Sequence, residues 1–211
     1  MLPKYRVVDI SRRLQVGKPT NTYNSVRRLE LARITFPNQN NQIAHDLTIM
    51  SHAGTHVETP AHMGRNGKNV ADFAPDTFVG EAVLAEVTHR APRGSVSAAD
   101  LENATRGDVR PGDILLIWGR YAAEDRPRIS LGAAQWIVAH QVKLLGFDSV
   151  DGIDDDAHDV ILGNNIPMLE DYRGLEQIHR LRVFLIALPL PIVDLDACPV
   201  HAVVLEEVVG G

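Results

Sequence analysis

The stretch that decides the architecture is Ser51-His52-Ala53-Gly54-Thr55-His56-Val57-Glu58-Thr59-Pro60-Ala61-His62. Its three histidines and its one carboxylate all stand at even-numbered positions. Successive side chains of an extended strand point to opposite faces, so these four polar residues would share one face. The small and apolar residues at positions 53, 57 and 61 would turn to the other face. We therefore predict a strand that packs on one side and presents candidate ligands on the other: His52, His56, Glu58 and His62.

A helix is the alternative structure for this run, because two histidines four residues apart share a helix face, as in the zinc-protease motif. That motif requires a glutamate directly after the first histidine, where this chain has Ala53. Gly54 and Pro60 also disfavour a helix interior. We expect a strand with a bend at Gly54, since full extension would place the backbones of His52 and His56 ~13 Å apart. At that separation, two imidazoles would reach one zinc ion, at ~2.0–2.1 Å, only near the limit of their length.

The ordinary state of a single histidine is a hydrogen-bonded, partly buried side chain. Clustering changes the expectation, because three imidazoles and a carboxylate on one face are costly to desolvate without a cation. We therefore expect metal binding by this run.

The run resembles the signature His-x-Gly-Thr-His-x-Asp-x-Pro-x-His of the cyclase family of metal-dependent hydrolases, which includes bacterial kynurenine formamidases and isatin hydrolases. One position departs, because Glu58 stands where the family has Asp. The longer carboxylate still supplies hard oxygen ligands, but its extra methylene moves them by more than the ~0.2 Å that metal distances tolerate unless the backbone retreats. The resemblance implies a divalent metal, Zn²⁺ or Mn²⁺, with one or two ions per chain. It also implies a homo-oligomer, a homodimer or homotetramer, because the amino-terminal segment of the family often approaches a neighbouring subunit's site.

A second part of the resemblance lies downstream, where the family carries a histidine and a glutamate at the separation of His158 and Glu170. Between them, Gly163-Asn164-Asn165-Ile166-Pro167 is typical of a helix end and a turn. A short helix beginning near His158 would end there, and the chain would return Glu170 towards it. The nearby Asp151, Asp154, Asp155 and Asp156 do not form an EF-hand loop, since counting from Asp154 the sixth position is Asp159 instead of glycine.

Composition restricts the class of protein. The length of 211 residues and the 45% hydrophobic content are ordinary for one globular domain. The formal charge of −6 and the absence of a basic cluster argue against a nucleic-acid partner. The longest apolar stretch, Phe184–Val193, holds two prolines and is too short to span a bilayer, so we expect a buried strand and its exit. The lone Cys198 excludes an internal disulfide, favours a cytoplasmic location and is expected to be a small buried side chain.

Short apolar runs alternate with helical segments, and no linker or repeat divides the chain. We expect an α/β fold: one compact domain over residues 1–211 with a mixed, partly antiparallel sheet, which the resemblance implies to be of the cyclase family's swivelling β/β/α type. The expected strands are Arg6–Ile10, Glu81–Val87, Asp113–Ile117, Leu144–Phe147, Phe184–Leu188 and Val200–Leu205. The expected helices are Ala98–Ala104, capped by Ser97, and Leu131–Gln141, preceded by Ser130. The polar segment Arg12–Asn41 shows no pattern and is expected to be loop.

Two functions follow from these residues and from the resemblance. In the first, a metal held by His52, His56 and Glu58 activates a water for attack on the amide-type carbonyl of a small molecule, a formamide or a cyclic amide. His62, His158 and Glu170 would then hold a second ion, with Glu58 bridging, or act as acid and base around a single ion. In the second, the chain is a metal- or small-ligand-binding protein that kept the scaffold and lost turnover, an alternative that rests on Glu58.

Overall fold

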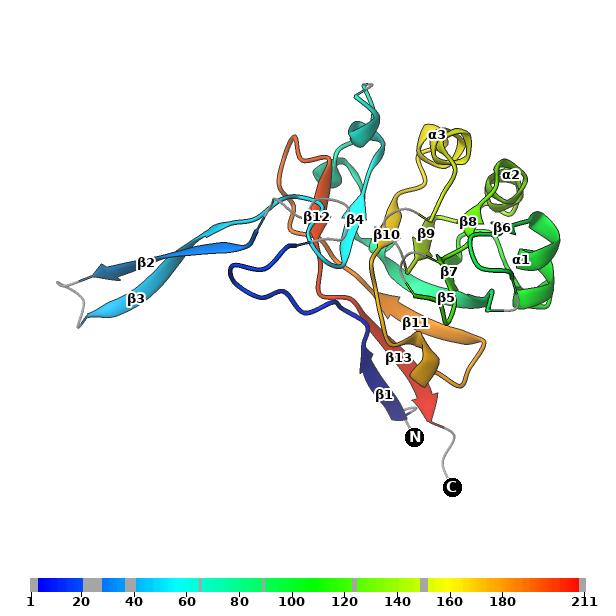
Figure 1. Ribbon diagram of the computed structural model, residues 1–211, viewed down its shortest axis with the longest axis horizontal. Coiled ribbons are helices and arrows are strands. Elements are labelled where there is room, and N and C mark those ends of the chain that lie inside the picture. Colours follow the sequence, from blue (N-terminus) through cyan, green and yellow to red (C-terminus); the bar gives the residue numbers. More distant parts are fainter. Residues whose placement is uncertain are drawn as a thin grey trace.

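One large sheet organises the chain in the computed structural model, which describes residues 4–20, 28–36, 41–64, 66–88, 90–122, 125–148 and 152–208. Within these residues, nine strands pair in the order β1-β13-β11-β5-β7-β9-β10-β4-β12 (Figure 1). The strands are β1 (Lys4–Asp9), β4 (His56–Glu58), β5 (Val79–Glu86), β7 (Ile114–Trp118), β9 (Leu144–Phe147), β10 (Met168–Glu170), β11 (Arg182–Ile186), β12 (Ala197–Pro199) and β13 (Val203–Val208). Strands β5, β7, β9 and β10 are parallel, and the other pairs are antiparallel. The mixed α/β architecture predicted from the sequence is confirmed.

Three helices cover one face of this sheet in the described part of the chain (Figure 1). They are α1 (Ala98–Thr105), α2 (Leu131–Ala139) and α3 (Asp155–Gly163). Ser97 caps α1 through a hydrogen bond from the backbone N–H of Asp100, whose side chain in turn accepts from the N–H of Ser97. Ser130 caps α2 by accepting from the N–H of Ala133. Both helices thus begin where the sequence predicts, because a cap is a local interaction.

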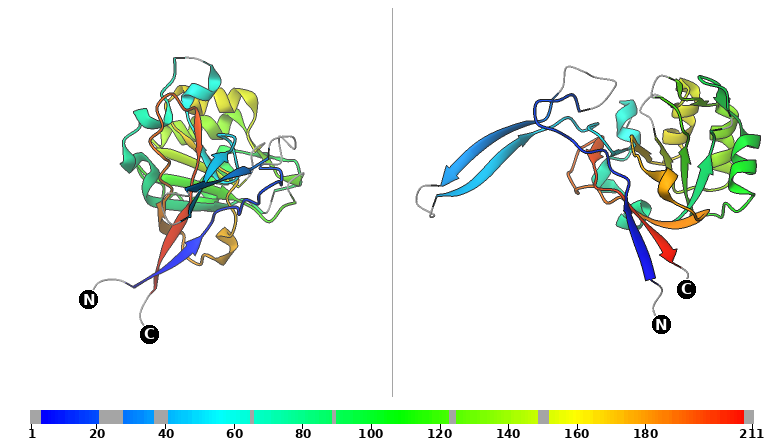
Figure 2. Two further views of the ribbon diagram at one scale, coloured as in Figure 1. Left: turned by 90° about the vertical axis from the view of Figure 1, so that its left-hand side faces the viewer. Right: turned by 60° about the horizontal axis from the view of Figure 1, so that its bottom comes forward.

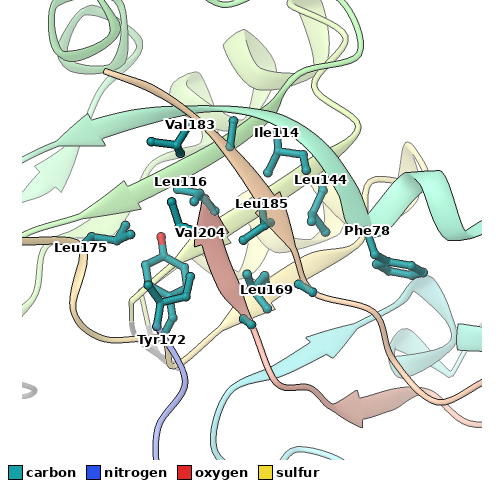
Figure 3. Close-up of a cluster of buried hydrophobic side chains, with 14 of the residues drawn as sticks. Phe78, Ile114, Leu116, Leu144, Leu169, Tyr172, Leu175, Val183, Leu185 and Val204 are labelled. Carbon is teal, nitrogen blue, oxygen red and sulfur yellow. The ribbon is translucent and has the colours of Figure 1, made fainter. Parts of the chain in front are cut away.

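The sheet separates two hydrophobic layers. Alternate residues of β7 divide between them: Leu115 and Ile117 pack under the helices, whereas Leu116 packs on the other face with residues of β11 and β13. Figure 3 shows this second layer inside the curl of the sheet, with Tyr172, Leu185 and Val204 around Leu116. Because both faces are covered, the two central parallel strands β7 and β9 carry no charged side chain.

The segment before residue 49 differs from the expected loop. It contains a two-stranded hairpin, β2 (Glu30–Phe36) and β3 (Gln42–Thr48), which extends away from the body of the molecule (Figure 2). Most of its side chains are exposed, so no buried face imposes the apolar alternation by which a strand is recognised. Residues 21–27 and 37–40 of the expected loop lie outside the described residues.

The apolar stretch Phe184–Val193 is also partly different from the expectation. Strand β11 begins two residues earlier, at Arg182, and ends at Ile186. The exit that follows the strand is exposed, with Leu190 63% and Val193 73% accessible. Cys198 is buried as expected, and burial raises the pKa of its thiol. No described helix has both the length and the apolar character needed to cross a bilayer.

Two small elements complete the described structure. Strands β6 (Ser95–Val96) and β8 (Arg128–Ile129) form a parallel pair, and Ile129 continues into a bridge with Ile153. Short 3-10 turns are η1 (Pro60–Met63), η2 (Val70–Asp72), η3 (Pro75–Phe78) and η5 (Leu175–Gln177).

Candidate metal centre

Strand β4 places the candidate ligands on the helix-covered face of the sheet. It lies between β10 and β12, with His56 opposite Glu170 and Glu58 opposite Met168. Met168 belongs to the layer under the helices, whereas Val57 belongs to the layer on the other face. Because side chains alternate along a strand, His56, Glu58 and Glu170 all face the helices.

The extended strand predicted for the whole run is wrong in extent, although its polar residues do converge. Only His56–Glu58 is strand. Gly54 has φ of +59°, a left-handed conformation that makes the expected bend and folds His52 back beside His56. After Glu58 the chain enters the 3-10 turn η1, which carries His62. The bend at Gly54 and the turn after Glu58 therefore bring the side chains together, which alternation along a straight strand would not do.

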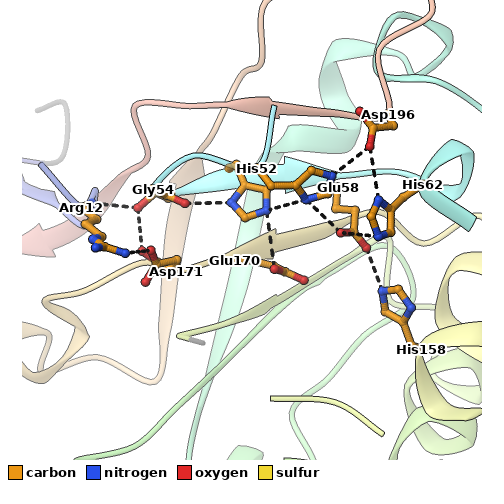
Figure 4. A network of polar contacts seen from close by, with 11 residues as sticks. Arg12, His52, Gly54, Glu58, His62, His158, Glu170, Asp171 and Asp196 are labelled. Atoms are coloured by element: carbon orange, nitrogen blue, oxygen red, sulfur yellow. Dashed lines mark hydrogen bonds and ion pairs between the residues drawn. The ribbon is translucent and has the colours of Figure 1, made fainter. Parts of the chain in front are cut away.

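The side chains meet around the carboxylate of Glu58 (Figure 4). Its Oε2 lies 3.2 Å from Nδ1 of His52 and 3.7 Å from Nε2 of His62. Its Oε1 lies 2.8 Å from Nε2 of His158. Nε2 of His56 is 3.2 Å from Nδ1 of His52 and 3.5 Å from Oε2 of Glu170. All six residues named from the sequence thus lie in one constellation.

Helix α3 supplies His158 in the way that the downstream motif predicts, although it begins at Asp155, before His158. It ends at Gly163, and Asn165 has a left-handed φ of +57°. Strand β10 then starts three residues later and ends on Glu170. Asp155 and Asp156 form the first turn of α3, and Asp151 lies outside the described residues.

Hydrogen bonds determine which imidazole nitrogens carry lone pairs. Nδ1 of His56 faces the carbonyl oxygen of Gly54 at 2.8 Å and must donate to it, so Nε2 is the acceptor nitrogen. Nε2 of His52 lies 2.9 Å from a carboxylate oxygen of Asp196, so its Nδ1 is directed at Glu58. With a neutral His52, lone pairs of two imidazoles and a carboxylate would face one another, so the arrangement requires either a proton on Nδ1 of His52 or a metal cation between them.

The protonation states follow from burial and from these contacts. Complete burial lowers the pKa of His56 to about 4, which keeps its imidazole neutral and able to bind a metal. Burial alone would raise the pKa of Glu58, but hydrogen bonds from His158 and His52 lower it to about 2. Burial lowers the pKa of His52, yet its contacts with Glu58 and Asp196 outweigh this and raise it above the ordinary value.

Asp196 is a site residue that the sequence analysis missed. One of its oxygens, Oδ2, lies 2.9 Å from Nε2 of His52 and 3.2 Å from Nδ1 of His62. It precedes β12, whose pairing with β4 brings it back to the motif across 144 positions of sequence from His52. No spacing pattern in the sequence connects Asp196 to the histidines. Its place directly before Ala197-Cys198-Pro199 is the one sequence feature that could have drawn attention to it.

A second group of polar contacts supports the bend at Gly54. The hydroxyl of Thr55 donates to the carbonyl oxygen of Asp171 and accepts from the backbone N–H of Arg12. The guanidinium of Arg12 pairs with the Asp171 carboxylate at 2.6 Å. These bonds attach the chain before β4 to the chain after Glu170, so both halves of the centre are held by one network.

The donor set fits a divalent metal ion. Ligand atoms of His52, His56 and Glu58 all lie within 4.8 Å of one another, and the same holds for His52, His62 and Asp196. Imidazole nitrogens with carboxylate oxygens are the ligands of zinc and manganese sites. The primary set predicted from the sequence is therefore brought together by the fold.

The chain matches known proteins over most of its length. The family model "Cyclase" matches residues 8–154. A kynurenine formamidase of Salinibacter ruber is 34% identical over 174 residues, which cover 76% of this chain and 78% of that protein. One of Erythrobacter litoralis is 29% identical over 171 residues, 76% of each chain. Isatin hydrolase A of Ralstonia solanacearum, at 22% identity, shares the fold with a TM-score of 0.80 over 96% of this chain and 92% of its own. The chain belongs to the cyclase family, as the resemblance implied.

Proposed function

We propose that this protein is a metal-dependent hydrolase that cleaves the amide-type bond of a small molecule, a formamide or a cyclic amide. The observation that carries the proposal is the convergence of four imidazoles on the carboxylates of Glu58 and Glu170, between the sheet and helix α3. Relatives named kynurenine formamidase and isatin hydrolase share the family and the fold, respectively.

In this proposal His52, His56 and Glu58 hold the primary ion. Zn²⁺ or Mn²⁺ bound there would supply a water with a pKa lowered from ~15.7 towards ~7, available as a nucleophile at neutral pH. The protein's own contribution is to orient the ligands. The carbonyl of Gly54 and the carboxylate of Asp196 each hold one imidazole with its lone pair inward.

His62, His158 and Glu170 have two roles open to them. The two oxygens of Glu58 contact different histidines: Oε1 contacts His158, whereas Oε2 faces His52 and His62. Glu58 thus contacts His52 of the primary set and both histidines of the second set, so it would contribute to a second ion as well as to the first. With one ion, Glu170 and a histidine would instead take a proton from the water and return it to the leaving amine.

The test is hydrolysis of N-formyl aromatic amides and of cyclic amides by protein reconstituted with Zn²⁺ or with Mn²⁺. We expect turnover that disappears on chelation and returns with metal, and elemental analysis giving one or two ions per chain. Glu170→Gln, which removes the charge but keeps the shape, is the test variant and should lose most of the turnover. Stoichiometric metal binding without turnover on either substrate class would contradict the proposal and favour the binding-protein alternative.

We infer that the whole chain acts as one domain and as a homo-oligomer, a homodimer or homotetramer, in the cytoplasm. Strands β1 and β13, from opposite ends of the described chain, are neighbours in one sheet, which supports one domain.

The hairpin β2–β3 supports association, because Leu31, Ile43 and Leu47 are 43%, 53% and 58% accessible on an arm that projects from the body (Figure 2). Light scattering would give the mass, and Leu31→Lys with Leu47→Lys should lower it if the arm is an interface. A single cysteine fits a reducing compartment.

A further inference from the structure

A cavity of about 180 Å³ lies at the carboxyl ends of three adjacent parallel strands, β7, β9 and β10. Its lining comes from the segments that follow these strands and includes Trp118, Arg126, Asp148, Arg173, Leu175 and Glu176. In open α/β sheets, ligands bind outside the carboxyl ends of strands, where the connecting segments converge. The position alone makes this cavity a candidate binding site.

The cavity is separate from the metal centre. Trp118 and Leu175 belong to the hydrophobic layer inside the curl of the sheet, whereas Glu58 and Glu170 face the helices. Arg173 of the cavity binds the carboxylate of Asp171, which is next to Glu170 in the chain. A ligand in the cavity would therefore not occupy the metal centre.

Arg126 is a buried and incompletely paired charged group of this cavity. Its side chain is only 11% accessible, and within the described part of the chain its one ion pair is with Oδ1 of Asp148, 3.3 Å from Nε. Nε itself makes no hydrogen bond. Among the described residues, no hydrogen bond from either terminal nitrogen is found, in contrast to Arg173, which donates to two carbonyl oxygens and to Asp171. The buried Nε is therefore an unsatisfied donor, which is unusual because leaving a buried donor unpaired costs more than a hydrogen bond contributes.

The charges of Arg126 and Asp148 are also incompletely compensated by each other. Burial lowers the pKa of Arg126 against the opposing effect of Asp148, and burial raises the pKa of Asp148 despite the nearby arginines. An anion beside Arg126 would satisfy its donors and stabilise its charge.

We propose that this cavity binds a small monocarboxylate with an apolar body, anchored by the guanidinium of Arg126. The planar fork of arginine matches a carboxylate with two parallel hydrogen bonds. The lining sets Arg120, Arg126 and Arg173 against Asp148 and Glu176, so its formal charge is +1, which one carboxylate neutralises and a dianion such as phosphate exceeds. Trp118 and Leu175 provide apolar surface for the body of the ligand. The proposal does not depend on the chemistry of the metal centre.

The experiment follows thermal unfolding of the full chain with benzoate, at constant ionic strength maintained with chloride. At ten times its dissociation constant, benzoate should raise the melting temperature by about 3–6 °C. The rise should persist after the metal is chelated. Arg126→Met should weaken benzoate binding about 10–100-fold, since it removes hydrogen bonds to a charged group. The affinity of Arg126→Lys should lie between those of the unaltered protein and Arg126→Met. Arg110→Met is the matched control, because Arg110 also pairs with one aspartate but is exposed and outside the cavity.

Three results would overturn the proposal: a rise that vanishes on chelation, a rise of equal size in Arg126→Met, or a larger rise with inorganic phosphate than with benzoate. If Arg126→Met fails to fold because Asp148 is left unpaired, the double variant Arg126→Met/Asp148→Asn removes both charges and should fold without binding benzoate. A crystal soaked with 4-bromobenzoate should show the bromine signal in the cavity, and a signal only at the metal centre would contradict the assignment.

Discussion

Asp196→Ala tests how the metal ligands are held in place. One oxygen of Asp196 contacts both His52 and His62, at 2.9 and 3.2 Å, so a single substitution removes two orienting hydrogen bonds. Loss of such a partner typically costs 10–100-fold in metal affinity or activity. The Asp196 side chain is 36% accessible, which weakens each bond by solvent screening, so we expect the lower part of this range, about 10–30-fold.

Asp196→Asn separates charge from geometry. Its amide oxygen can still accept from one or both imidazoles, but bonds to an ionised acceptor are about twice as strong as those to a neutral one. About half of the free energy should therefore be lost, which corresponds to about 3–5-fold in affinity. The assay is competition for Zn²⁺ against a chelator of known affinity, followed by elemental analysis at saturating metal.

The matched control is Asp194→Asn, which removes a carboxylate from the same loop at an exposed position with a left-handed φ of +61° that asparagine also accepts. It should leave metal affinity unchanged. Unchanged affinity in Asp196→Ala would refute the orienting role. A lost ion per chain at saturating metal would also refute it, because it would make Asp196 itself a ligand together with His52 and His62.

Four further outcomes are expected. Glu170→Gln should lower turnover by about 10²–10⁴-fold while one metal per chain remains, measured by initial rates and elemental analysis. Glu58→Asp should retain the ion if the local backbone adjusts, and loss of metal would show a site built for the longer side chain. Gly54→Ala should destabilise the fold by about 1–2 kcal/mol in urea unfolding, because its φ is +59° and the new Cβ would lie 2.9 Å from a methyl of Leu14. Burial alone would raise the pKa of Glu206, but backbone N–H and arginine contacts lower it. A depressed carboxyl pKa adds stability above its unfolded value and loses it as the pH falls, so Glu206→Gln should cost about 1–2 kcal/mol at pH 7 and little at pH 3.

Local patterns were sufficient for the starts of α1 and α2 and for naming most of the residues that meet in the candidate metal centre. Ser97 and Ser130 start their helices as predicted, because a cap involves only residues three positions apart. The run from His52 to His62 likewise carries its ligands close together in the chain, so its composition already indicated a metal centre. Strand β9 has the predicted bounds, Leu144–Phe147, since a short apolar run between polar turns is readable without its partners.

Contacts between distant segments decided the rest. The even-numbered positions of the ligand residues predicted a long strand, but the strand that pairs with β10 and β12 has only three residues. The bend at Gly54 and the turn at Pro60 bring the remaining histidines to Glu58. The same pairing brought Asp196 to His52, and the junction of β7, β9 and β10 created the cavity around Arg126. The sequence alone determined which chemical groups are available. Only the tertiary structure decided which of them meet, because strand register and the closure of a sheet depend on residues more than a hundred positions apart.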